Sequence, residues 1–173
     1  MKKNKLAFGA IAVLCMALGL FWGLHRIGQE PPKTSAVDKL LSQSMTDTSG
    51  QLQHLAQWKQ RALIVNFWAT WCAPCVQEMP ALSALQSEIA PDGIQIIGVG
   101  IDSAANIAQF AAKYQITYPL YTGGINATDL LREFGDKEGG LPFTVLIGHD
   151  GRVRKTYLGR LKMEALRREL AGL

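Results

Sequence analysis

Residues 62–75 carry the strongest signal in the chain, and they read Ala62-Leu63-Ile64-Val65-Asn66-Phe67-Trp68-Ala69-Thr70-Trp71-Cys72-Ala73-Pro74-Cys75. The first half is an apolar run that predicts a buried β-strand. A helical segment follows, so the two cysteines fall on its first turn. Sulfur atoms three residues apart on that turn are close enough to form a disulfide and to open it again. A Cys-x-x-Cys motif between a strand and a helix indicates redox chemistry.

The start of the predicted helix favours a reactive sulfur. Its unpaired backbone N–H groups and the positive end of its dipole both stabilise a thiolate, which is the attacking species. We therefore predict that Cys72, at the mouth of the helix, is the nucleophile, and that Cys75 then attacks Cys72 to release the reduced partner. An inert disulfide is the alternative. No metal site is expected, because His54 and His149 lack the spacing that would complete four zinc ligands.

The N-terminal segment predicts a membrane anchor. Three lysines precede an uncharged run from Leu6 to Leu24, whose 19 positions would span roughly 28 Å as a helix. The basic flank places the N-terminus in the cytoplasm and the rest of the chain on the far side. We expect residues 1–26 to remain as an uncleaved signal anchor. A signal peptide cleaved after Gly19, which would release the domain, is the alternative.

The charges support this division of the chain. Lys and Arg total 18 and Asp and Glu total 14, and the first 26 residues hold four of the basic residues and none of the acidic ones. The remainder is balanced, so nucleic-acid binding is not expected. The exported part contains only Cys72 and Cys75. A domain stapled for stability would carry more pairs, and a bridge across so short a loop adds little, so reactivity explains this pair better.

The remaining pattern predicts an α/β domain. Residues 27–37, with Gly28 and two prolines, are typical of a linker, and residues 38–173 are enough for one domain. A hairpin is expected from strands at 40–45 and 51–53. Strands and helices then alternate and imply a central mixed β-sheet flanked by helices, with the motif beyond the carboxyl end of a central strand. The expected strands are 62–67, 94–101, 119–121, 143–147 and 153–158, and the expected helices are 73–89, 104–114, 128–134 and 162–170.

At this point the chain resembles a known family, the thioredoxin-like TlpA/ResA group that includes the CcmG/DsbE proteins. The resemblance rests on the stretch from Val65 to Cys75 followed by Glu78 and Pro80. It also rests on Ile101-Asp102-Ser103 and on Gly140-Leu141-Pro142 before an apolar strand, and it covers residues 40–170. It implies a thioredoxin-like fold with an added N-terminal hairpin. Members of the group are periplasmic or membrane-tethered thiol–disulfide oxidoreductases, mostly reductants.

The resemblance also implies further site residues. Pro142 would be a cis-proline facing the cysteines, and the backbone of Leu141 would pair with a substrate segment; an ordinary trans proline is the alternative. Trp71 would belong to the docking surface or be a packing residue. Pro74 fits the first helical turn and restricts the backbone between the sulfurs.

Glu78 would exchange protons with Cys75. Thioredoxin has a buried aspartate where this chain has Asn66, which cannot take a proton, so Glu78 is the available carboxylate. The alternative is an acid placed early in the helix because the dipole favours it. Asp102 and Ser103 are both candidate N-caps of the helix expected at 104–114, and no role beyond a cap is expected for Asp102.

These expectations combine into a function. We predict a single-pass protein of the bacterial inner membrane whose domain faces the periplasm and reduces disulfides of exported proteins. Apocytochrome c, during cytochrome c maturation, is one candidate client, and a membrane electron donor of the DsbD/CcdA type would restore the dithiol. No cofactor is expected beyond the Cys72–Cys75 disulfide. The alternatives are a DsbA-type oxidase, a non-catalytic chaperone or assembly factor, and a peroxiredoxin-type peroxidase, for which no separate Thr-x-x-Cys pattern exists.

Overall fold

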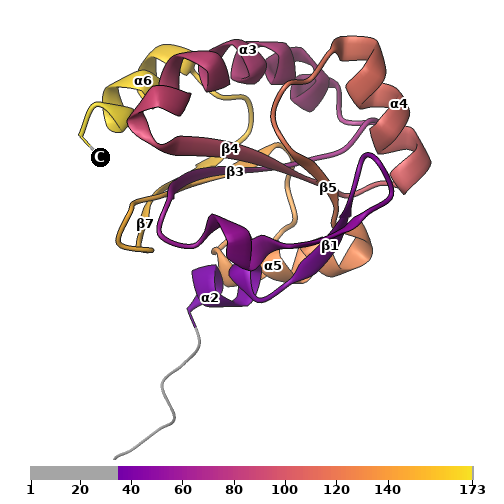
Figure 1. The fold of residues 1–173 in the computed structure, drawn as a ribbon, viewed down its shortest axis with the longest axis horizontal. Helices are drawn as coiled ribbons and strands as arrows, with labels where there is room; N and C mark the ends of the chain where they lie inside the picture. Colours follow the sequence, from indigo (N-terminus) through magenta and orange to yellow (C-terminus); the bar gives the residue numbers. More distant parts are fainter. Residues whose placement is uncertain (1–34, 173) are drawn as a thin grey trace, which may run out of the picture. The chain divides into compact units, whose positions relative to one another are not determined.

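Two parallel strands form the centre of a seven-stranded sheet with the order β2-β1-β5-β4-β3-β6-β7 (Figure 1). The computed structural model describes residues 35–172, so the predicted anchor and nearly all of the predicted linker lie outside the described residues. Within 35–172, no helix combines the length and the apolar character that crossing a membrane requires. The strands are β1 (Ser44–Asp47), β2 (Leu52–His54), β3 (Ala62–Trp68), β4 (Ile94–Gly100), β5 (Leu120–Thr122), β6 (Phe143–Ile147) and β7 (Val153–Leu158).

Helices cover both faces of this sheet, as Figure 1 shows. The central strand β3 is therefore shielded from water on both sides, which explains why all seven of its residues are buried and why each is either apolar or hydrogen-bonded through its side chain. One apolar core lies under α3, α4 and α6, and a second lies between the other face and α2 and α5. The helices are α2 (Ala36–Leu41), α3 (Ala73–Ile89), α4 (Ala104–Tyr114), α5 (Ala127–Glu133) and α6 (Met163–Leu170), with 3-10 turns η1 (Leu55–Trp58), η2 (Ala90–Asp92) and η3 (Gly124–Asn126).

The expected thioredoxin-like arrangement of a mixed sheet between helices is present, and helices α3 and α4 have the predicted bounds. The predicted strand at 40–45 is wrong in its first half. Ser35 caps α2 by accepting a hydrogen bond from the Asp38 backbone N–H, and Val37 and Leu40 bury their side chains. The helix therefore begins at Ala36, inside the stretch predicted as linker. Strand β1 begins only at Ser44 and pairs antiparallel with β2.

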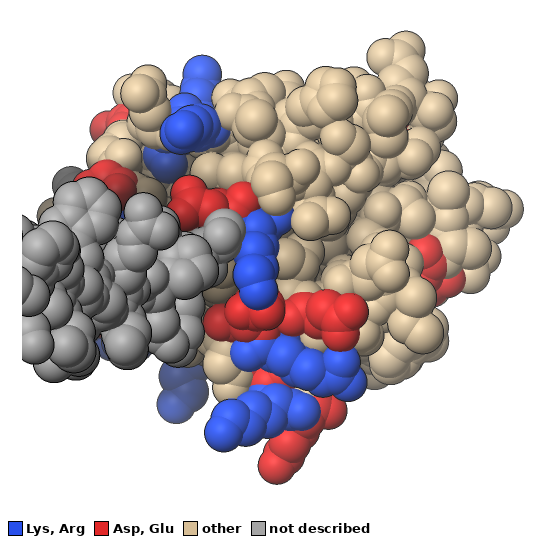
Figure 2. Space-filling view, turned by 90° about the horizontal axis from the view of Figure 1, so that it is seen from below, with Lys and Arg blue, Asp and Glu red and all other residues tan. Residues whose placement is uncertain are grey.

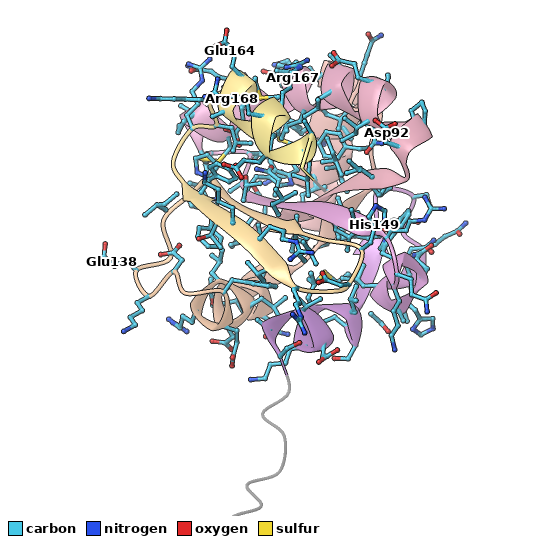
Figure 3. All side chains as sticks on the ribbon, turned by 90° about the vertical axis from the view of Figure 1, so that its left-hand side faces the viewer. Asp92, Glu138, His149, Glu164, Arg167 and Arg168 are labelled. Carbon is cyan, nitrogen blue, oxygen red and sulfur yellow. A yellow bond between two sulfur atoms is a disulfide. The ribbon has the colours of Figure 1, made fainter. Side chains whose placement is uncertain are left out.

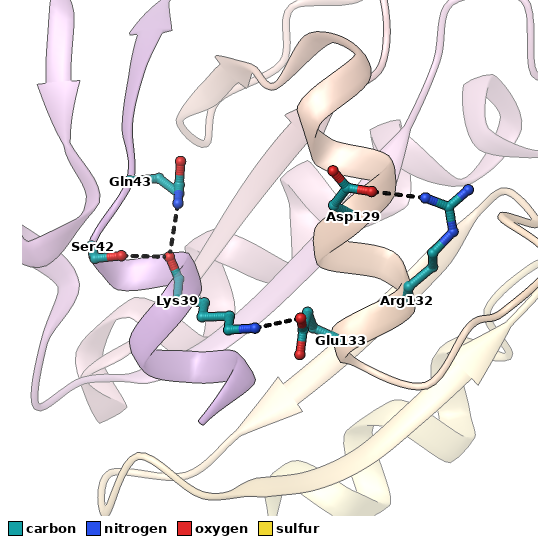
Figure 4. A network of polar contacts seen from close by, with 6 residues as sticks. All are labelled: Lys39, Ser42, Gln43, Asp129, Arg132 and Glu133. Atoms are coloured by element: carbon teal, nitrogen blue, oxygen red, sulfur yellow. Dashed lines mark hydrogen bonds and ion pairs between the residues drawn. The ribbon is translucent and has the colours of Figure 1, made fainter. Parts of the chain in front are cut away.

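Helices α2 and α5 lie side by side beneath the sheet. Lys39 of α2 forms an ion pair with Glu133 of α5, and Arg132 and Asp129 pair along α5 at 2.7 Å (Figure 4). All four side chains are exposed, so these pairs contribute little and the apolar contacts of α2 hold the helices together. Figure 2 shows basic and acidic side chains next to one another on this face rather than in separate fields.

A side chain from α3 completes the hydrogen bonding of β4. Strand β5 pairs with β4 only from Gly98 onward, which leaves the earlier edge of β4 without a strand partner. Gln86 fills this gap: its Oε1 accepts from the Ile96 N–H at 2.6 Å, and its Nε2 donates to the Ile94 carbonyl at 3.3 Å. Because Gln86 is buried, water cannot replace these bonds.

We expect Gln86→Met to lower the free energy of unfolding by roughly 1–3 kcal/mol, because it keeps the side-chain length but leaves two buried backbone groups of β4 unpaired. Urea unfolding followed by circular dichroism measures this. Ser87→Ala, on the exposed side of the same helix, is the matched control. Equal stability of the two variants would show that Gln86 does not support β4.

Candidate active site

The two cysteines form a disulfide at the N-terminus of α3, with Cα atoms 5.3 Å apart. Cys72 is the N-cap residue, and its Sγ accepts a hydrogen bond from the Cys75 backbone N–H at 3.3 Å. Cys72 is 6% exposed and Cys75 is fully buried. Cys72 is therefore the cysteine of the pair that reaches the surface, and it lies where the helix dipole and the free N–H groups act on a sulfur.

The peptide bond between Leu141 and Pro142 is cis, as the resemblance implied. Phe143, the next residue, pairs with Phe67 near the end of β3, so Pro142 lies at the same end of the sheet as the cysteine loop. The Pro142 carbonyl accepts from the Gly159 N–H at 2.8 Å, which ties this loop to the end of β7. Figure 3 shows the β7 side of the domain, with Glu138 in the loop that precedes β6 and His149 in the turn between β6 and β7.

Glu78 is buried at 2% exposure, one turn after Cys75. Its Oε1 accepts from Asn66 Nδ2 at 3.0 Å, and its Oε2 accepts from the Leu161 backbone N–H at 2.9 Å. Burial raises the pKa of Glu78, and these bonds together with the charge of Arg160 offset only part of the rise. The dipole does not account for this acid, because α3 has none in its first turn.

Asn66 connects the buried carboxylate of Glu78 to the sheet. Its Nδ2 also donates to Thr144 Oγ1 at 3.0 Å, while its Oδ1 has no partner among the described residues. Trp68 Nε1 and the Tyr118 hydroxyl are likewise buried without a partner there, and both side chains lie against the space above Gly98. Burial and the nearby charge of Glu78 raise the pKa of Tyr118. Buried polar groups thus extend from Glu78, on the helix of Cys75, into the sheet.

The other predicted site residues lie on the surface around the disulfide. Trp71 is 69% exposed and Pro74 is exposed, whereas Leu141 is half-buried. Trp68 differs from Trp71 in its exposure: Trp68 is fully buried, and its ring centroid lies 4.7 Å from that of Phe110. Among the described residues, no group of His, Cys, Asp and Glu side chains is arranged to hold a metal ion.

Sequence reasoning missed the partners of two acids. Leu161 is 83 residues from Glu78, and no local pattern indicates that contact. Of the two predicted cap candidates, Ser103 is the N-cap of α4, its Oγ accepting from the Asn106 N–H at 3.2 Å, and Asp102 is not. The Asp102 carboxylate instead accepts hydrogen bonds from Thr70, in the loop that leads to Cys72.

Comparison with known proteins places this site in a class. The model of the Redoxin family matches residues 28–170. A thiol-disulfide oxidoreductase ResA of Bacillus cereus is 30% identical over 177 residues, covering 96% of this chain and 95% of that protein. The ResA of Geobacillus thermodenitrificans is 30% identical over 131 residues, covering 75% of this chain and 72% of that protein.

A solved structure of a thiol:disulfide interchange protein has a similar fold. A thioredoxin-family thiol:disulfide interchange protein from Chlorobium tepidum TLS superposes with a TM-score of 0.63 at 27% identity, covering 82% of this chain and 95% of that one. The chain belongs to the Redoxin family, within its thioredoxin-like TlpA/ResA/CcmG group. It is a thiol–disulfide oxidoreductase with a Cys-x-x-Cys pair.

The raised pKa of Glu78 predicts a pH dependence of stability. Between the ordinary value of 4.5 and the higher value in the fold, the folded protein holds a proton that the unfolded chain has lost. The folded state then binds more protons, so this group's contribution to the free energy of unfolding falls as the pH rises through that window. We expect Glu78→Gln to remove that fall, measured by urea unfolding of the oxidised protein at a series of pH values.

The difference between the wild-type and variant curves isolates Glu78. Carboxylates whose pKa values are lowered in the fold make the free energy of unfolding rise with pH, and they do so at lower pH. These contributions are the same in the wild type and the variant, so they cancel in the subtraction; the carboxylates concerned are Asp47, Asp102 and Asp150. Glu164→Gln, which removes an exposed acid of α6, is the control. A pH-independent difference curve would contradict the buried, proton-binding state of Glu78.

Proposed function

We propose that the protein reduces disulfides of exported proteins through Cys72 and Cys75, from a tethered position on the periplasmic side of the bacterial inner membrane. The observation that carries the proposal is the placement of Cys72 as a sulfur cap on α3, at the same end of the sheet as cis-Pro142. Exposed apolar side chains support a protein client. Trp71 precedes Cys72, and Leu158, which pairs with Phe143, is 63% exposed.

The first step uses the reduced pair. The Cys72 thiolate, stabilised by the N-terminus of α3, attacks one sulfur of the client's disulfide. A bond forms between Cys72 and that sulfur, the client's own S–S bond breaks, and its second sulfur leaves as a thiolate that takes a proton from water. Leu141 and cis-Pro142 would hold the client segment in extended form during this step.

The second step releases the client. Cys75 gives its thiol proton to Glu78, whose raised pKa suits a proton acceptor. The Cys75 thiolate then attacks Cys72, forms the disulfide found in this structure, and frees the client's first sulfur as a thiolate. That thiolate takes a proton from water, and Glu78 returns its proton to water. In total, two electrons and two protons pass from the dithiol to the client. A second dithiol must reverse this change, and we assign that role to a membrane donor of the DsbD/CcdA type.

The N-terminal sequence supports the location. An uncleaved anchor at 1–26 would keep the domain close to a membrane donor and to newly exported chains. Apocytochrome c, whose cysteines must be reduced before haem attachment, is the client class that we propose. Reduction of its disulfide would then be a step of cytochrome c maturation.

We expect Cys72→Ser to abolish reduction of insulin disulfides, because it removes the attacking sulfur. Cys75→Ser should instead accumulate mixed disulfides with clients, because the second step cannot occur. The full-length Cys75→Ser protein, captured from intact cells and analysed by mass spectrometry, identifies those clients, and the double serine variant is the control. Full insulin reduction by Cys72→Ser would overturn the assignment of the nucleophile.

The direction of electron flow is tested separately. We expect a reduction potential near that of thioredoxin, about −270 mV, rather than near that of DsbA, about −120 mV. Equilibration with glutathione or dithiothreitol buffers, followed by thiol alkylation, measures it. A value close to that of DsbA would mean that the protein oxidises its clients.

A further inference from the structure

The loop from Trp68 to Cys72, which joins β3 to α3, is fixed by neighbouring groups at each step. The Trp68 carbonyl accepts from the Ile101 N–H at 2.8 Å, and the Cys72 N–H donates to the Ala69 carbonyl at 3.2 Å. Between them, the backbone N–H of Thr70 donates to Asp102 Oδ2 at 3.3 Å, and the Thr70 hydroxyl donates to the same oxygen. One carboxylate oxygen therefore holds the middle of the loop.

The other oxygen of Asp102 holds a different element. Oδ1 accepts from the Ser103 backbone N–H and from Asn106 Nδ2, both at 2.7 Å, at the start of α4. Asp102 thus links the loop before Cys72 to the N-terminus of α4, across 32 residues of sequence. Partial burial raises the pKa of Asp102, but the four hydrogen bonds lower it by more, so the net pKa is below the ordinary value. The link stays ionised at neutral pH.

We propose that Asp102 is a positioning residue for the thiol–disulfide reaction, acting through Thr70 to set the place of Trp71 and Cys72. This inference rests on the proposed role of Cys72. The Cys72 sulfur is stabilised only while it stays aligned with the first-turn N–H of α3, and a shift of the preceding loop moves it out of line. Trp71, which is largely exposed, depends on the same backbone for its direction.

Asp102 could act on the Cys72 thiol through its charge or through its position, and the two effects predict opposite changes in the pKa of that thiol when Asp102 is replaced. If its negative charge acted directly on the sulfur, removing that charge would lower the pKa of the Cys72 thiol, and removing the Thr70 hydroxyl would change little. If Asp102 acts by position, loss of either partner loosens the loop and raises the pKa of that thiol. The two substitutions Asp102→Asn and Thr70→Val therefore separate charge from position.

The experiment measures alkylation of Cys72 by iodoacetamide in the reduced full-length protein across a pH series, with the modified peptide identified by mass spectrometry. We expect Thr70→Val to slow alkylation at neutral pH about three- to tenfold, through a higher thiol pKa, because a charge-assisted hydrogen bond is lost. Asp102→Asn should change the profile in the same direction. Thr70→Ser, which keeps the hydroxyl, should restore the wild-type profile.

Ser103→Ala is the matched control for a merely structural role. It removes the cap of α4 but leaves the bonds between Thr70 and Asp102, so it should lower the unfolding midpoint without changing the Cys72 profile. A wild-type profile in Thr70→Val, or an equal change in Ser103→Ala, would overturn the proposal. A lower thiol pKa in Asp102→Asn would also overturn it, in favour of direct charge. Failure of the proposed function itself would appear differently, as insulin reduction that persists in Cys72→Ser.

Discussion

The site depends on one hydrogen bond, in which the sulfur of Cys72 caps the first turn of α3. A helix begins with four N–H groups that have no partner within it, and oxygen atoms of Ser, Thr, Asp or Asn usually supply the acceptor. Here the acceptor is the sulfur that we propose as the nucleophile. A thiolate accepts such a bond more strongly than a thiol, so the fold favours the reactive form. The position of α3 against the fully buried strand β3 then fixes where that sulfur points.

Burying Glu78 opposes folding, and three elements share in offsetting that cost. Asn66 comes from β3, Leu161 comes from the segment before α6, and Thr144 on β6 holds Asn66 in place. A buried charge with good partners seldom improves stability over an apolar residue of the same size. Function is therefore the better explanation for an acid beside the cysteines. The neutral amide of Asn66 suits this arrangement, because it donates a hydrogen bond without competing for the proton.

The sequence predicted the elements whose signals are local. Strand β3, helices α3 and α4 and the Cys-x-x-Cys turn follow from apolar runs, helical spacing and turn residues. Helix α2 was missed because six residues give too little periodicity to separate a short helix from a strand. The cis bond at Pro142 came from family resemblance alone. The contacts of Glu78 with Leu161 and of Thr70 with Asp102 could not be predicted, because they join segments that only the folded sheet brings together.

Two carboxylates near the cysteines differ in proton affinity because their surroundings differ. Glu78 is buried with two hydrogen-bond donors, and burial raises its pKa. Asp102 is only partly buried and receives four hydrogen bonds, which lower its pKa despite that burial. When one site pushes the pKa values of two acids apart, the acids suit different tasks. The acid that readily holds a proton lies on the helix of Cys75, and the acid that stays ionised anchors the loop of Cys72.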